Sequence, residues 1–438
     1  GDDDRTKNQI RGLYQGKNKK GWIFFTEAPG QDPNGLHPDE SMRQRLCERA
    51  SLGYGVIVRL NNGYEPAGTL PESRYYDGFA AACARWVDLY LKRPDLSQSQ
   101  YTWTIQIANE QNNPREHPGG WEHPREHITP ELYAEAFNKV YPQIKAVLPN
   151  SIVCPGAIDP YNSAPMKLLG NVRWRPLDYY QTMLDNIHTL DGIILHAYTH
   201  GPDLETITHL TTFGDPFMDD HYFDFQTYRL FMERIPAKWK DVPVYITETN
   251  HICRPPSAPV CDDPNALGWV NSNTGWVRAL YKEIDGWNKT PYAQQIRTAL
   301  LYRWTGDQWA LDNKGGILEN FKQALNNDYR WRTTPAAAVS FAVSFAVEEE
   351  APTAEIERAI VKPDDLKLIW GIGPKTERAL KIAGVQIFEE LARMTEDQIK
   401  DLLGESGIYG RYVETWPQQA RLLAEGKSEE LMALQDKL

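Results

Sequence analysis

Two glutamates, Glu110 and Glu248, stand at the ends of the apolar runs TWTIQIA (102–108) and PVYITET (243–249). Hydrolysis of a glycosidic bond needs a proton on the leaving oxygen and a carboxylate that stabilises or attacks the oxocarbenium-like centre. A pair of carboxyl groups supplies both, provided that their surroundings keep one protonated and the other ionised. We therefore interpret Glu110 and Glu248 as a candidate catalytic pair.

Other residues with suitable chemistry follow the same kind of run. An arginine beside one carboxyl would keep it ionised, and partial burial would keep the other protonated. An asparagine can donate to a sugar hydroxyl, and a tryptophan can form a stacking floor for the ring. The candidate substrate-binding residues are Arg59, Asn109, His196, Tyr198 and Trp304.

Seven apolar runs alternate with amphipathic helical patterns over the first 333 residues. The predicted strands cover 21–28, 54–60, 102–108, 151–157, 192–198, 243–249 and 299–304, and predicted helices include 39–50, 76–93, 130–148 and 177–190. Repeated strand-then-helix units favour a parallel sheet, and the length favours a (β/α)8 TIM-type barrel. Function in such barrels lies at the C-terminal ends of the strands. An eighth strand could be missing at the N-terminus or hidden in QIRGLYQ (9–15).

The order of these motifs resembles the clan A (4/7) glycoside hydrolases over roughly residues 20–330. IANEQN (107–112) resembles the Asn-Glu motif that ends strand four, and ITETN (246–250) resembles the nucleophile motif that ends strand seven, with two predicted strands between them. His196 and Tyr198 resemble the His-x-Tyr of strand six, and Trp304 the tryptophan of strand eight. The resemblance implies that Glu110 is the acid/base, Glu248 the nucleophile, Asn109 a substrate donor, Tyr198 a contact of the nucleophile and Trp304 a platform in the −1 site. Arg59 would be the nucleophile's partner, at the end of strand two or three.

The rest of the chain divides into a linker at 334–362 and a small all-α domain at 363–438. The segment Trp370-Gly-Ile-Gly-Pro-Lys375 joins two helical patterns and resembles the helix-hairpin-helix module. In members that bind DNA, the hairpin amides hold a backbone phosphate. Residues 363–438 contain 10 Lys and Arg against 14 Asp and Glu, a net charge of −4, which is not the footprint of a nucleic-acid binder. We therefore expect a protein partner or self-assembly through this domain, and a passive stabilising appendage is the alternative.

Composition narrows the class of protein further. The formal charge is −12, and no apolar run reaches the length of a membrane span. The loop REHPGGWEHPREH (115–127) is dense in His and Glu and could bind a metal, but we expect a polar loop at the rim of the cleft, with no metal or cofactor.

The leading hypothesis is a retaining hydrolase of β-linked oligo- or polysaccharides. The alternatives are a non-catalytic carbohydrate-binding or scaffold protein and, less favoured by charge, a nucleic-acid-associated protein. The compartment stays open.

Overall fold

The protein divides into two compact units, residues 1–337 and 338–438, and each is described by itself. The computed structural model describes residues 4–17, 19–92, 101–252, 268–291, 293–307, 309–332, 364, 366–383, 385–405 and 412–435. The predicted linker at 334–362 lies outside the described residues.

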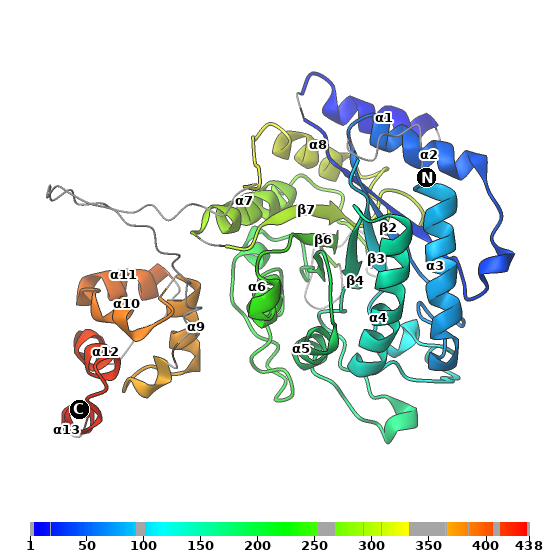
Figure 1. Ribbon diagram of the computed structural model, residues 1–438. Helices are drawn as coiled ribbons and strands as arrows, with labels where there is room; N and C mark the ends of the chain where they lie inside the picture. The colour runs from blue at the N-terminus through cyan, green and yellow to red at the C-terminus, as the bar shows by residue number, and fades with distance from the viewer. Residues whose placement is uncertain are drawn as a thin grey trace, which may run out of the picture. The chain divides into compact units, whose positions relative to one another are not determined.

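The first unit contains two sheets in which every neighbouring pair of strands is parallel. Figure 1 shows the strands inside a layer of helices. One sheet has the order β1 (Trp22–Glu27), β2 (Gly55–Leu60), β3 (Thr104–Ile107) and β4 (Ile152–Pro155), and the other has β5 (Ile193–His196), β6 (Val244–Thr249) and β7 (Ile296–Leu301). Each of the seven predicted apolar runs overlaps one of these strands, so the predicted parallel, mixed α/β class is confirmed.

Helices alternate with the strands, and the four predicted helices, at 39–50, 76–93, 130–148 and 177–190, are among them. The helices are α1 (Asp4–Tyr14), α2 (Glu40–Ser51), α3 (Tyr76–Tyr90), α4 (Pro130–Val147), α5 (Pro176–Asn186), α6 (Thr227–Arg234), α7 (Trp276–Lys289) and α8 (Gly315–Ala324). Local chemistry sets the start of α4. Thr129 caps α4 by accepting a hydrogen bond from the Leu132 amide, and Pro130 occupies the first turn, where its missing N–H costs nothing.

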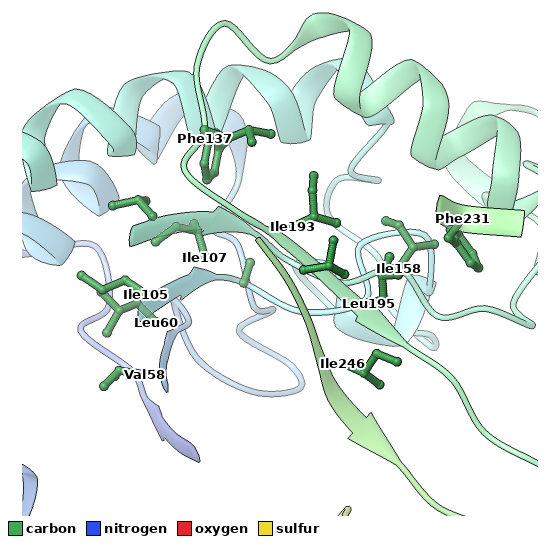
Figure 2. Packing of buried hydrophobic residues seen from close by; sticks show 14 of the residues in the cluster. Val58, Leu60, Ile105, Ile107, Phe137, Ile158, Ile193, Leu195, Phe231 and Ile246 are labelled. Atoms are coloured by element: carbon green, nitrogen blue, oxygen red, sulfur yellow. The ribbon is translucent and has the colours of Figure 1, made fainter. Parts of the chain in front are cut away.

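The strands sort their residues onto two faces with a period of two. Side chains on the outer face, such as Val58, Leu60, Ile105 and Ile107, belong to one buried cluster with Phe137 of α4, and Figure 2 shows part of this cluster. The alternate residues point inward. A separate buried cluster there gathers Ile57, Cys154, Ala157, Ile194 and Tyr245, with Trp22, Phe24, Ile152 and Leu300 packed against it. Residues from both sheets therefore share one interior. Polar residues that come later on the same inward face, such as Arg59, His196 and Thr247, lie at the C-terminal end of that interior.

The place suggested for an eighth strand was wrong. Residues 9–14 belong to helix α1, because Thr6, Ile10 and Leu13 recur at helical rather than alternating spacing and line a common cavity. Within the described ranges, no ladder joins β4 to β5 or β7 to β1. The complete eight-stranded barrel therefore stays a prediction.

The second unit is all-helical in its described residues. It contains the 3-10 turn η7 (Leu366–Leu368) and the helices α9 (Pro374–Ile382), α10 (Phe388–Ala392), α11 (Glu396–Glu405), α12 (Trp416–Ala424) and α13 (Ser428–Gln435). Its core is built around Leu366, Leu380, Leu391 and Trp416, each fully buried. Gly371 takes a φ of +97° in the hairpin before α9, a conformation that side chains rarely adopt.

Candidate active site

Six of the seven predicted site residues are joined by hydrogen bonds at the C-terminal ends of the strands. They come from four strands that lie far apart in the sequence: Arg59 from β2, Asn109 and Glu110 after β3, His196 and Tyr198 at the end of β5, and Glu248 near the end of β6. Parallel strands present their carboxyl ends at one edge, which explains the convergence. The register of β6 shifts against both neighbours at this end, and such irregularities re-aim side chains.

Glu248 is held as a carboxylate. Arg59 donates from Nη1 to Glu248 Oε1 at 2.7 Å, and only 9% and 8% of the two side chains are exposed. Burial alone would favour the neutral acid, but the charge and hydrogen bond of the Arg59 guanidinium, together with the hydrogen bond from the Tyr198 hydroxyl, lower the pKa of Glu248 below its ordinary value. Glu248 is therefore ionised at neutral pH.

Glu110 has the opposite preference. Burial, and then the negative charge of Glu248, raise the pKa of Glu110 from 4.5 to about 8. His196 Nδ1 lies 2.7 Å from Glu110 Oε1, and burial lowers the pKa of His196 to about 4. At neutral pH the proton therefore resides on Glu110, which donates it in a hydrogen bond to the neutral imidazole.

Tyr198 connects the two carboxyls. Its hydroxyl lies 3.1 Å from Glu248 Oε2 and 3.4 Å from Glu110 Oε1. One oxygen of Glu110 and one of Glu248 lie within 4.8 Å of each other. Two carboxyl groups at this separation can act on the same bond from two sides, one as acid and one as nucleophile.

The backbone that presents Glu110 is unusual. Ala108 and Glu110 both have positive φ values, 60° and 46°, a region that residues other than glycine seldom occupy and that costs about 1–3 kcal/mol each. The Glu110 amide donates to the Ala157 carbonyl, and the Asn109 carbonyl accepts from the side chains of Thr69 and Gln111. This turn is held by tertiary contacts rather than by its own preference.

The side-chain NH2 group of Asn109 is available to bind a ligand. Its Oδ1 accepts from Arg59 Nη1 at 2.6 Å. The carbamoyl oxygen is therefore occupied, and the amide NH2 is the group that Asn109 can donate to a substrate hydroxyl.

Trp304 is not joined to the other six residues by any hydrogen bond or ion pair found in the described ranges. It is half-buried three residues beyond the end of β7 and lines a cavity of about 960 Å³ that Arg59 and Tyr302 also line. Tyr302 follows β7 directly, and burial together with the charge of Glu248 raises its pKa. The stacking role of Trp304 stays a prediction, and Tyr302 is a residue that the sequence did not single out.

Two further carboxyls lie close enough to Glu110 for their charges to interact. Burial and then Glu110 raise the pKa of Glu116 to about 8 and that of Asp159 to about 7. Glu116 lies in the loop that the sequence indicated as rich in His and Glu, and Asp159 follows β4. The sequence could have indicated Asp159 as a site residue, because it follows a predicted strand as Glu110 and Glu248 do.

Glu110, His196 and Glu248 are also the group that, within the described ranges, is close enough to share a metal ion. However, Arg59 already neutralises Glu248, and Glu110 retains its proton at neutral pH. A divalent cation would have to displace that proton and lie beside the guanidinium. We expect no metal here, and this stays a prediction.

Comparisons with known proteins separate the two units. The family described as "RS2/RL21/YNQ2 HHH domain" matches residues 366–424, so the second unit contains a helix-hairpin-helix domain of this kind. The large ribosomal subunit protein bL21 of Hyphomonas neptunium is 39% identical over 69 residues. These are 16% of this chain, and the match spans about a third (34%) of the length of that protein.

Several solved structures that resemble about three quarters of this chain are glycoside hydrolases. Thermotoga maritima Cel5A in complex with cellobiose has a TM-score of 0.43 and 13% identity, and the match covers 74% of this chain and 90% of that one. The GH53 catalytic domain of Ignisphaera aggregans has a TM-score of 0.42 and 14% identity, with 72% and 87% covered. The cellulose synthase subunit CcsZ of Clostridioides difficile has a TM-score of 0.41 and 12% identity, with 74% and 92% covered. The case for an activity therefore depends on the geometry of the site.

No helix in the described part of the chain is both long and apolar enough to cross a membrane.

Proposed function

We propose that the first unit is a retaining glycoside hydrolase that acts on β-linked oligo- or polysaccharides by double displacement. The observation that carries this proposal is the contrast between the surroundings of two neighbouring carboxyls. Glu248 is ionised beside Arg59 at 2.7 Å, whereas burial raises the pKa of Glu110 to about 8. Retaining enzymes need this pair at about 5–5.5 Å, whereas inverting enzymes need about 6.5–9.5 Å to admit a water. The approach of the two groups to within 4.8 Å supports retention.

In the first step, a carboxylate oxygen of Glu248 attacks the anomeric carbon while Glu110 gives its proton to the leaving glycosidic oxygen. The bond between that oxygen and the anomeric carbon breaks, and a glycosyl ester of Glu248 forms. In the second step, the ionised Glu110 takes a proton from water, whose oxygen bonds to the anomeric carbon and releases Glu248. After the second step both carboxyls have their starting charges again, with Glu110 protonated and Glu248 ionised.

The neighbouring residues support these charges. Arg59 donates to Glu248 Oε1 and the Tyr198 hydroxyl donates to Glu248 Oε2. These two hydrogen bonds hold the Glu248 carboxylate in one orientation toward the anomeric carbon. When Glu110 loses its proton, the Tyr198 hydroxyl at 3.4 Å can donate a hydrogen bond to the new carboxylate. The Asn109 amide donates to a sugar hydroxyl, and Trp304 or Tyr302 supplies the stacking surface.

The test is hydrolysis of a panel of β-linked oligo- and polysaccharides by the wild type, Glu110→Gln and Glu248→Gln. Glu122→Gln on the exposed loop is the matched control. We expect cleavage by the wild type and the control, with losses of several orders of magnitude in the two site variants. The anomeric configuration of the first product, followed by proton NMR, decides retention. Cleavage that survives in Glu248→Gln would rule out the double displacement.

For the second unit we propose a protein contact, either with a partner or with another copy. Three large apolar side chains, Leu368, Trp370 and Met432, are 55%, 55% and 61% exposed there. Gln435 of α13 donates to the Leu368 carbonyl at 3.0 Å, which links α13, the helix that carries Met432, to η7. Nucleic-acid binding is not proposed, because the net charge of residues 363–438 is −4.

A protein contact through the second unit is also compatible with the alternative function. In that alternative the first unit binds carbohydrate without cleaving it, and the second unit assembles the protein. Light scattering of the full chain and of Trp370→Ser, over a range of concentrations, measures self-assembly. If the wild type and Trp370→Ser both keep the monomeric mass at every concentration, self-assembly is excluded. The contact would then be with a different protein. Hydrolysis in the panel would exclude the non-catalytic alternative.

A further inference from the structure

The loop at 115–127 contains two buried histidines that the proposed chemistry does not use. His117 is fully buried and His127 is 3% exposed, whereas His123 of the same loop is exposed. The planes of their rings make an angle of 70° in an edge-to-face contact, and the two Nδ1 atoms lie 3.0 Å apart. Two buried imidazoles in contact need a defined arrangement of protons, because two bare nitrogens or two N–H groups facing each other would repel.

The contacts of His117 fix its tautomer. Its Nε2 lies 2.6 Å from the Gln111 carbonyl oxygen, which only accepts, so Nε2 carries the proton and donates. Its Nδ1 receives the Ile128 amide N–H at 3.4 Å and therefore carries none. His117 is a neutral ring, and burial lowers its pKa to about 3.

His127 must then have the other tautomer. Because the Nδ1 of His117 is bare, the N–H between the two rings belongs to His127 Nδ1. The remaining nitrogen, His127 Nε2, is buried and meets no hydrogen-bond partner within the described residues. An N–H at that atom would be an unpaired buried donor, so the bare nitrogen is the less costly state.

The pair is connected to Glu110 through Gln111. His117 donates to the Gln111 carbonyl, and the Gln111 side chain donates at 2.5 Å both to the Asn109 carbonyl and to Thr69 Oγ1. Asn109 lies between the two residues with positive φ, Ala108 and Glu110. A backbone held in that region depends on such contacts from outside.

We infer that His117 and His127 are positioning residues for Glu110: as a neutral pair with fixed tautomers, they hold Gln111 and so the strained turn that presents the acid. The kinetic part of this inference rests on the proposed hydrolase function, whereas the tautomers and the order of the turn do not. His127 sets the tautomer of His117, and His117 makes the contact to the turn. The His- and Glu-rich loop thus supports the site from behind.

The variants separate this role from simple packing. His127→Asn keeps a donor where Nδ1–H lies, and His127→Leu removes it while filling much of the space. His123→Asn, on the exposed part of the loop, is the control. We expect His127→Leu to lower kcat at least tenfold with KM within about twofold, because displacement of a catalytic group impairs the transition state more than binding. His127→Asn should recover kcat to within about threefold of the wild type.

Nitrogen-15 NMR of histidine-labelled full-length protein gives the independent measurement. We expect His117 protonated at Nε2 and His127 at Nδ1 from pH 6 to 8, and at least tenfold faster amide exchange at Glu110 in His127→Leu. The reverse tautomers, or a cationic ring, would overturn the inference. So would equal kcat values for His127→Leu and His127→Asn. If the wild type hydrolyses nothing, the proposed function fails, and the NMR and exchange results still decide the role of the pair.

Discussion

Replacing Glu110 by glutamine should make the protein more stable than the wild type as the pH rises. In the folded state, burial and the charge of Glu248 raise the pKa of Glu110 from 4.5 to about 8, and only 14% of its side chain is exposed. Between these two pH values the folded protein holds a proton that the unfolded chain has released. Unfolding therefore releases a proton, and the free energy of unfolding decreases as the pH increases. Glutamine cannot ionise and does not have this dependence.

The magnitude follows from the difference in pKa. Each unit of pKa difference corresponds to about 1.4 kcal/mol. Integrated between about pH 5 and pH 7, the wild type loses about 2–3 kcal/mol relative to Glu110→Gln. The quantity to measure is the difference in unfolding free energy between the two proteins, from urea titrations at several pH values. The second unit contributes equally to both and cancels.

The control is Glu122→Gln, an exposed glutamate for which the same difference should not vary with pH. If the stability difference between Glu110→Gln and the wild type changes by less than about 0.5 kcal/mol over this range, Glu110 is ionised at pH 5. That result would refute its assignment as the acid.

Two further predictions concern the site, and a third concerns the core of the second unit. The rate of hydrolysis should rise as Glu248 loses its proton below about pH 4.5 and should fall as Glu110 loses its own near pH 8, and Glu110→Gln should lack the alkaline decrease with an activated aryl glycoside. Arg59→Met leaves the buried Glu248 carboxylate uncompensated, so urea unfolding should show a loss of about 3–5 kcal/mol and the acidic limb should move to higher pH. An unchanged acidic limb would contradict the role given to the ion pair. In the second unit, Trp416→Ala should cost about 3–5 kcal/mol, because that ring is fully buried, and Trp370→Ala, 55% exposed, less than about 1 kcal/mol by thermal unfolding.

The sequence was sufficient to predict the strands and the residues that they carry to the site. Continuous apolar runs identified all seven strands, because strands covered on both sides leave no alternation of polar and apolar residues. The first residues after each run then formed the candidate list. Arg59, Glu110, His196 and Glu248 meet because parallel strands place these positions at one edge.

The sequence was not sufficient to fix the register near the last strand. The run ALLYRW predicted a strand at 299–304, whereas β7 covers Ile296–Leu301. Pairing with β6 decides this, with register shifts that depend on neighbours rather than on local residue types. As a consequence, Tyr302 rather than Trp304 follows the strand directly.

The candidate residues, and their order along the chain, are thus determined by the sequence itself, since residue type and periodicity are local properties. Only the tertiary structure decides which carboxyl holds the proton. Glu110 and Glu248 have the same side chain, and the pKa of each depends on burial and on partners from other strands. The same holds for the positive φ of Ala108 and Glu110 and for the tautomers of His117 and His127. Each of these states is costly by itself and persists because contacts from distant parts of the chain stabilise it.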